Sequence, residues 1–173
     1  MGRVKTLPNL LTLLRIFLLP FIVVLIVEGQ RLAALFLFIV SSITDFLDGY
    51  IARKRKSITS LGMLLDPIAD KLLTSSTLIS LAYVKLCDPY SVIAIVGREE
   101  AVTGMRAIAA SRGMVIPASK GGKLKTLLIM LSIVLLLAGV KPWGEALLVL
   151  SALVAVITGA LYFYDFFKNL KEQ

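Results

Sequence analysis

Residues 45–70 read DFLDGYIARKRKSITSLGMLLDPIAD, and this stretch decides the fold because it sets acidic residues against long apolar segments. Its four carboxylates are Asp45, Asp48, Asp66 and Asp70, and a basic run at 53–56 separates the two pairs. Charged groups at membrane depth are costly and usually face a functional cavity. The stretch therefore predicts two apolar helices that carry an acidic site close to the basic turn between them.

The composition around this stretch is that of a membrane protein. Of 173 residues, 58% are hydrophobic, and the mean hydropathy is +0.89. An ordinary soluble domain has about 45–50% apolar residues. We therefore expect one all-α integral-membrane domain over residues 1–173, because two soluble domains would lack the polar surface to cover them. Cytoplasmic loops rich in Lys and Arg explain the net charge of +8, so no nucleic-acid partner is expected.

Six segments are apolar enough, at about 20 residues each, to cross a bilayer as helices. They cover residues 8–27, 32–52, 60–84, 89–111, 123–140 and 144–167. With Arg15, Lys71, Arg98 and Arg106 left out because they lie within the segments, twelve Lys and Arg residues fall on one side. They lie at the two termini, in 53–56 and in 112–125, which includes the start of the fifth segment, whereas three (Arg31, Lys85 and Lys141) fall on the other side. Because the excess of Lys and Arg faces the cytoplasm, both termini are predicted there. The protein is expected in the cytoplasmic membrane as a multi-pass protein.

The residue types that the chain lacks limit its chemistry. It contains no histidine, which excludes a Ser-His-Asp triad and the HExxH zinc motif. Its single cysteine, Cys87, cannot form an intrachain disulfide and has no base or metal ligand near it in the sequence. Any catalysis must therefore rely on carboxylates.

The spacing of the four carboxylates predicts two tiers. Asp45 and Asp48 are three residues apart and Asp66 and Asp70 four, so each pair lies on one face of its helix. In an antiparallel hairpin, Asp45 would be level with Asp70 and Asp48 with Asp66, in tiers about 4.5–6 Å apart. Four carboxylates this close cannot all stay ionised unaided. Oxygen ligands favour magnesium or manganese, so we expect two divalent cations, Mg²⁺ or Mn²⁺.

Small residues surround the predicted acidic site. Gly49 and Ala52 follow the first acidic pair by one turn, and Gly62 precedes Asp66 by one turn. They leave room for a bulky ligand, and Arg53 can offer its guanidinium to a phosphate. A hairpin packed through small residues explains the glycines equally well but leaves four buried acids unexplained. A small cation-coupled transporter is the alternative of another class, which Arg53 disfavours because a cation pathway gains nothing from a fixed positive charge.

The pattern Asp45-x2-Asp48-Gly49-x2-Ala52-Arg53-x8-Gly62-x3-Asp66-x3-Asp70 resembles the signature of the CDP-alcohol phosphotransferases. The resemblance implies a six-helix membrane fold, usually a homodimer, that transfers a phosphatidyl group from CDP-diacylglycerol to an acceptor hydroxyl and releases CMP. It also implies that the four aspartates ligate two metal ions and that Asp70 is the general base. The nucleotide and pyrophosphate site would then comprise Gly49, Ala52, Arg53 and Gly62, with Asn9, Thr12 and Thr59 as further candidates.

The basic residues after residue 97 are the candidates for binding the acceptor. The candidate ligands of an acceptor phosphate are Arg106, Arg112, Lys120, Lys123 and Lys125, with Arg98 as a further candidate. A cationic pocket suggests an acceptor that carries a phosphate, such as glycerol 3-phosphate or inositol phosphate. Some of these residues could instead have a purely structural role. Arg112 and Lys120 fit an ordinary basic cytoplasmic loop. Arg98 and Arg106 could be neutralised by Glu99 and Glu100.

Three further stretches resemble the phosphatidylglycerophosphate synthases within that family. They are PNLLTLLR at 8–15, GRE at 97–99 and GKLKT at 122–126. A helix cap and a flanking arginine would also explain the first of them. The resemblance implies that CDP-diacylglycerol and sn-glycerol 3-phosphate give phosphatidylglycerophosphate and CMP. Such a reaction needs no nucleophilic side chain, so we expect one in-line displacement. Inositol phosphate remains the alternative acceptor.

Overall fold

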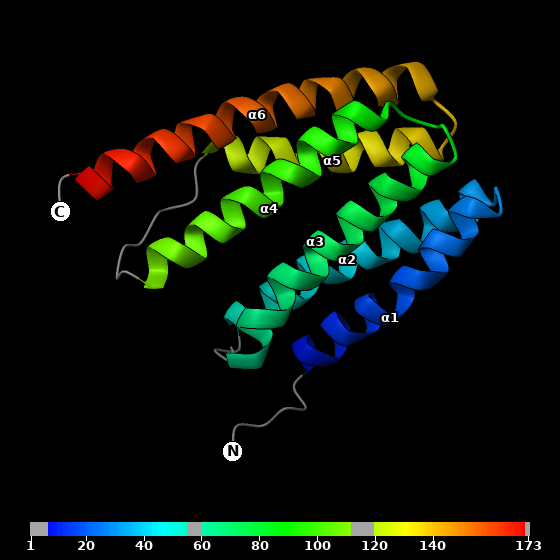
Figure 1. The fold of residues 1–173 in the computed structure, drawn as a ribbon. Helices are drawn as coiled ribbons and strands as arrows, with labels where there is room; N and C mark the ends of the chain where they lie inside the picture. Colours follow the sequence, from blue (N-terminus) through cyan, green and yellow to red (C-terminus); the bar gives the residue numbers. More distant parts are fainter. Residues whose placement is uncertain (1–6, 55–59, 112–119, 172–173) are drawn as a thin grey trace. The chain divides into compact units, whose positions relative to one another are not determined.

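The chain is all-helical throughout the part described by the computed structural model, which is residues 7–54, 60–111 and 120–171. That part contains six helices and no strand, and Figure 1 shows how these helices follow one another along the chain. Their bounds are α1 (Leu7–Val27), α2 (Arg31–Lys54), α3 (Ser60–Tyr83), α4 (Pro89–Ser111), α5 (Lys120–Leu137) and α6 (Lys141–Lys171). The predicted all-α class is confirmed.

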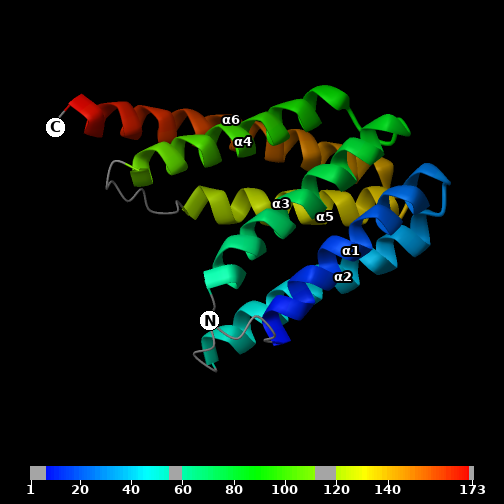
Figure 2. The ribbon, with the colours of Figure 1, turned by 60° about the horizontal axis from the view of Figure 1, so that its bottom comes forward.

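The helices form two compact units. The first unit comprises Met1–Lys85 with Leu137–Gly139, and the second comprises Leu86–Leu136 with Val140–Gln173. In the first unit α1 packs against both α2 and α3, and α1 and α2 run antiparallel (Figure 2). In the second unit α4 packs against α6. The sequence predicts a hairpin of the second and third helices, whereas within the described residues each of these helices packs mainly against α1.

The surface of the helices is as apolar as a bilayer requires. Leu10–Val27 and Lys141–Lys168 are long and apolar enough to cross a membrane, and Arg31–Thr44 and Leu124–Leu137 are shorter apolar stretches among the described residues. Phe17, Phe36 and Leu161 are exposed on the helices that carry these stretches. Large exposed apolar surfaces of this kind mark contact with lipid or with protein. Together with the composition, they are typical of a membrane protein.

Glycine turns end α1 and α5. After α1, the amide of Gln30 donates to the Leu25 carbonyl over 2.8 Å and the amide of Gly29 donates to Ile26 over 3.1 Å. Gly29 has a φ of +76° and Gly139, after α5, has a φ of +85°. Such left-handed residues close a helix by satisfying its last carbonyl groups, and glycine adopts them without strain. The predicted turn at 28–30 therefore has a clear local cause, whereas the turn at Gly139 falls within the predicted helix 123–140.

The last two helices differ from their predicted bounds. The sequence predicts 123–140 and 144–167, with residues 141–144 as a connection, whereas α5 ends at Leu137 and α6 already begins at Lys141. Gly139 ends α5 early. Pro142 lies in the first turn of α6, where a backbone N–H would have no acceptor within the helix, so that its absence in proline costs nothing. Lys141 also pairs with Glu145 one turn later, at 3.6 Å. The predicted connection is thus wrong, because its proline begins a helix.

An aspartate fixes the start of α4. Asp88 precedes Pro89, and its Oδ2 accepts hydrogen bonds from the amide of Ser91 at 2.7 Å and from the Ser91 hydroxyl at 2.8 Å. The hydrogen bond that the backbone amide of Ser91 donates lowers the pKa of the Asp88 carboxyl below its ordinary value. The cap therefore contributes stability above that ordinary value, and the contribution is lost as the pH falls through the lowered pKa.

Gly144 allows α5 and α6 to approach closely. A Cβ atom at this position would lie 2.7 Å from Leu136 Cγ and 3.0 Å from the Leu136 amide nitrogen. The buried Ser132 hydroxyl also donates to the Gly144 carbonyl at 2.7 Å. A side chain at position 144 would therefore force Leu136 to shift.

Replacement of Gly144 by alanine is expected to lower the free energy of unfolding by about 1–3 kcal/mol, the usual cost of overpacking. The matched control is Gly104→Ala in α4, where an added Cβ would have nothing within 4 Å. The control should keep or raise stability, because alanine favours helix over glycine by about 1 kcal/mol. Thermal unfolding in detergent compares the two variants, and an equal effect of both would contradict the close approach at Gly144.

Candidate functional site

Two of the predicted acidic residues lie one turn apart on α3. Asp66 and Asp70 are both half-buried, and Ala69 between them is buried. The buried Thr12 of α1 donates a hydrogen bond from Oγ1 to Asp66 Oδ1 at 2.5 Å. This contact joins two segments that lie 54 residues apart. The first helix therefore holds one of the carboxylates in place.

Arg15 is a buried arginine of α1 whose burial the sequence does not decide. It follows Thr12 by three residues on the same face of α1, and it is only 1% exposed. The sequence equally allows a flanking arginine that reaches back to the membrane surface. In the structure its guanidinium is instead buried inside the first unit, where a cation can offset carboxylates. An arginine one helical turn from a buried threonine, within an apolar segment, is the sequence signal for such a group.

The other predicted residues of this site lie largely outside the described side chains. Asp45, Asp48, Gly49, Ala52 and Arg53 belong to the last turns of α2, Gly62 to the first turn of α3 and Asn9 to the first turn of α1, and the side-chain positions at these places are outside the description. Thr59 falls outside the described residues altogether. Within the described side chains, no three His, Cys, Asp or Glu residues form a metal-binding group. The pairing of the four aspartates stays a prediction.

In the second unit, Glu99 brings two of the candidate cations together. Its Oε1 accepts a hydrogen bond from Arg98 Nη1 at 2.9 Å and forms an ion pair with Lys125 Nζ. The side chains of Arg98, Lys125 and Glu99 are 9%, 5% and 21% exposed. Glu99 therefore offsets one of the two positive charges that Arg98 and Lys125 bring to it, and pairing with Arg98 is one of the structural roles that the sequence allows.

Arg98 also ties α4 to α6. Its Nε donates to the Ala155 carbonyl at 3.2 Å, and its Nη2 donates to Thr158 Oγ1 at 3.2 Å. A Cβ on Gly159 would lie 2.9 Å from Arg98 Cγ. The arginine side chain thus lies across α6 at a glycine. These contacts favour a structural role for Arg98 over a role as a phosphate ligand.

Arg106 is held differently. Its Nη2 donates to the Tyr162 hydroxyl at 2.8 Å, and its Cζ lies 5.1 Å from the centre of the Tyr162 ring. Arg98 Cζ lies 5.7 Å from the centre of the same ring. Arg106 is exposed, in contrast to Arg98 and Lys125. The side chains of Lys120 and Lys123, in the first turn of α5, and all of Arg112 lie outside the description.

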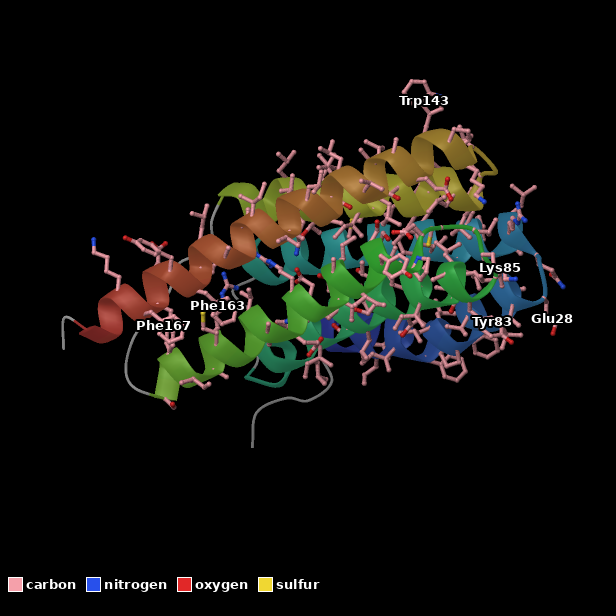
Figure 3. All side chains as sticks on the ribbon, turned by 45° about the horizontal axis from the view of Figure 1, so that its top comes forward. Glu28, Tyr83, Lys85, Trp143, Phe163 and Phe167 are labelled. Atoms are coloured by element: carbon pink, nitrogen blue, oxygen red, sulfur yellow. The ribbon has the colours of Figure 1, made fainter. Side chains whose placement is uncertain are left out.

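Tyr162 is part of an apolar cluster between α4 and α6. The cluster comprises Val102, Met105, Ala109, Tyr162 and Phe166, with Phe163 packed against it. Figure 3 shows Phe163 and Phe167 on α6, and their rings stack with centres 6.5 Å apart. This packing fixes the part of α6 that carries the tyrosine.

Cys87 is unsuited to covalent catalysis. The free thiol is buried in the segment between α3 and α4. Burial, with a further contribution from the charge of Glu145, raises the pKa of Cys87 to about 11. Since the thiolate is the nucleophile, little of it is present at neutral pH. The expectation of an inert cysteine agrees with this geometry.

Replacement of Thr12 by valine is expected to lower the free energy of unfolding by about 1.5–3 kcal/mol, the cost of losing a hydrogen bond to a charged group. Valine keeps the volume of the side chain but removes the donor to Asp66. Thr12→Ser is the control, because it keeps the hydroxyl. Thermal unfolding should show the larger loss for valine, and a valine variant as stable as the wild type would show that the bond contributes nothing.

Comparison with known proteins gives full-length similarities. The family model for CDP-alcohol phosphatidyltransferase matches residues 5–160. The CDP-diacylglycerol–glycerol-3-phosphate 3-phosphatidyltransferase of Rickettsia typhi is 40% identical over 170 residues, which cover 92% of this chain and 96% of that protein. The Bacillus subtilis protein of the same name is 36% identical over 189 residues, with 96% and 98% covered. A probable phosphatidylglycerophosphate synthase of Mycobacterium tuberculosis is 40% identical over 173 residues, with 93% and 81% covered.

Proposed function

Because the chain belongs to the CDP-alcohol phosphatidyltransferase family, we propose that it transfers the phosphatidyl group of CDP-diacylglycerol to sn-glycerol 3-phosphate. The products are phosphatidylglycerophosphate and CMP. The observation that carries this proposal is the identity of 36–40%, across at least 92% of this chain, with relatives that bear the names of this activity. The range that the family model matches, residues 5–160, includes every candidate residue from Asn9 to Lys125.

The donor atoms of the first unit suit hard divalent cations. Asp66 and Asp70 offer carboxylate oxygens, and the hydroxyl of Thr12 orients one of the Asp66 oxygens at 2.5 Å, as outer-shell groups do for metal ligands. We propose that Asp45, Asp48, Asp66 and Asp70 hold two such ions, Mg²⁺ or Mn²⁺. When bound, the ions neutralise the pyrophosphate of the donor and the charge on the leaving CMP.

The reaction follows as a single displacement. The acceptor hydroxyl oxygen bonds to the phosphorus that carries the diacylglycerol, while the bond from that phosphorus to the CMP oxygen breaks. Asp70 takes the proton of the hydroxyl. Gly49, Ala52, Arg53 and Gly62 surround the nucleotide and its phosphates, with Asn9 and Thr59 as further contacts. Thr12 acts through Asp66, because its hydroxyl proton is already donated to that carboxylate.

The membrane arrangement forms part of the proposal. Residues 1–173 act as one domain with six crossings and cytoplasmic termini, the active site faces the cytoplasm, and the protein works as a homodimer in the bilayer. In the first unit, Glu28, Tyr83 and Lys85 lie at one end (Figure 3), away from the residues next to the basic run at 53–56. The exposed Trp143 stands at the start of α6 (Figure 3). Basic cytoplasmic turns and interfacial aromatic residues are typical of such proteins.

An acceptor series tests the proposed activity. The purified protein receives CDP-diacylglycerol in mixed micelles, Mg²⁺ or Mn²⁺, and one acceptor at a time, and the CMP formed is measured. We expect CMP with glycerol 3-phosphate and little with glycerol or inositol, because the exposed Arg106 favours a phosphate on the acceptor. Preference for inositol phosphate would select the alternative acceptor. No CMP with any alcohol would overturn the proposal and leave a transport function to be examined.

A further inference from the structure

We propose that Tyr162 of α6 is a positioning residue, which holds the Arg106 guanidinium ready for the phosphate of the acceptor. The inference rests on the proposed function, since it assigns a role in binding a phosphorylated acceptor. Tyr162 lies two residues beyond the range 5–160 that the family model matches. Nothing in its sequence context distinguishes it from the other aromatic residues of an apolar helix.

The contacts of Tyr162 fix both its own ring and the guanidinium. The tyrosine is 6% exposed and belongs to the apolar cluster between α4 and α6. Its hydroxyl accepts the hydrogen bond from Arg106 Nη2 at 2.8 Å, and the guanidinium carbon stands 5.1 Å from the ring centre. A hydrogen bond and a cation–π contact from the same rigid side chain restrict a long, exposed arginine far more than either contact alone.

Arg106 pairs with a neutral group, the Tyr162 hydroxyl, and in this it differs from Arg98 and Lys125, the other described candidates for binding the acceptor phosphate. Arg98 and Lys125 both bind the Glu99 carboxylate, which cancels positive charge. Among the ion pairs of the described residues, none includes Arg106. A phenol orients the guanidinium but leaves its charge intact, so Arg106 keeps its attraction for an anion. The arrangement suits a ligand of the phosphomonoester class.

The donors of Arg106 also suit that ligand. A guanidinium carries five N–H donors in a planar fork, and the bond to Tyr162 uses one nitrogen. The remaining edges can bind two phosphate oxygens at once, provided that the plane is fixed. Tyr162 supplies the fixed plane. Its loss should therefore weaken acceptor binding without changing the chemical step.

Tyr162→Phe tests the inference, because it keeps the ring and removes only the hydroxyl. We expect the KM for glycerol 3-phosphate to rise about 10-fold, the lower end of the cost of losing one hydrogen bond to a charged group. The kcat and the KM for CDP-diacylglycerol should stay within about twofold, since the hydroxyl has no part in the chemistry. The matched control is Tyr164→Phe, an exposed tyrosine on the same helix, which should leave all three values unchanged.

A double-mutant cycle separates positioning from general packing. In the Arg106→Ala background, Tyr162→Phe should cause no further rise in the KM, because the group that it positions is gone. Additive effects would overturn the inference, as would an unchanged KM in Tyr162→Phe. Calorimetric titration of each variant with glycerol 3-phosphate gives a second readout that does not need turnover. Absence of CMP with the wild type overturns the proposed function alone, and equal affinity of the wild type and Tyr162→Phe overturns the role of Tyr162.

Discussion

Replacement of Asp70 by asparagine is expected to lower the rate of CMP release by at least about 1,000-fold, within the range that a general base contributes. Asparagine has nearly the same shape but cannot take the proton of the acceptor hydroxyl, and it is a weaker metal ligand. Binding of CDP-diacylglycerol should be kept at least in part, because three of the four aspartates remain. Initial rates at saturating acceptor, together with a donor-binding assay, measure the two effects.

Asp165→Asn is the matched control for this variant. Asp165 is exposed on α6 and belongs to neither proposed site, so its loss of charge should leave the rate unchanged. Normal turnover by Asp70→Asn would show that another group takes the proton. Equal loss of rate and of donor binding would show that Asp70 acts mainly through the metal ions.

Replacement of Glu99 by glutamine is expected to cost about 3–5 kcal/mol in the free energy of unfolding, the range found when one partner of a buried ion pair is removed. The side chains of Lys125 and Arg98 are 5% and 9% exposed, and both meet the same carboxylate oxygen. Glutamine removes the negative charge that these two positive charges share. Chemical or thermal unfolding in detergent measures the loss.

Two further variants make this prediction specific. Glu100→Gln removes the neighbouring charge, which is exposed, and should change stability little. Lys125→Met in the Glu99→Gln background removes one of the uncompensated charges and should restore part of the stability. If Glu99→Gln and Glu100→Gln proved equally stable, the contacts of Arg98 and Lys125 with Glu99 would contribute nothing to the free energy of unfolding.

The fold could be predicted from the sequence because long apolar segments and the turns between them are local signals. The first four helices begin and end within two residues of their predicted bounds. The predicted start of α6 was wrong because a Lys-Pro-Trp-Gly sequence is equally typical of a turn and of a first helical turn. The position of Gly139, with its positive φ, decides between them.

The candidate site was predictable where residue types follow a fixed spacing, as Asp66 and Asp70 do. The burial of Arg15 could not be predicted, because an arginine in an apolar segment can reach the membrane surface or stay buried, and only its 1% exposure in the first unit decides for burial. Whether Glu99 neutralises Arg98 depends on contacts between helices, which no spacing along the chain can give. Tyr162 has no signal in the sequence at all, because its role rests on an arginine 56 residues away.

The most direct test of transfer without an enzyme-bound intermediate is CMP formation with and without the acceptor. The purified protein receives CDP-diacylglycerol and Mg²⁺ or Mn²⁺, and CMP is followed from the first turnover. Direct attack by the acceptor predicts no initial burst of CMP without glycerol 3-phosphate, and one phosphatidylglycerophosphate for each CMP with it. A burst of CMP equal to the amount of protein, in the absence of any acceptor and with the phosphatidyl group bound to a side chain, would contradict the account.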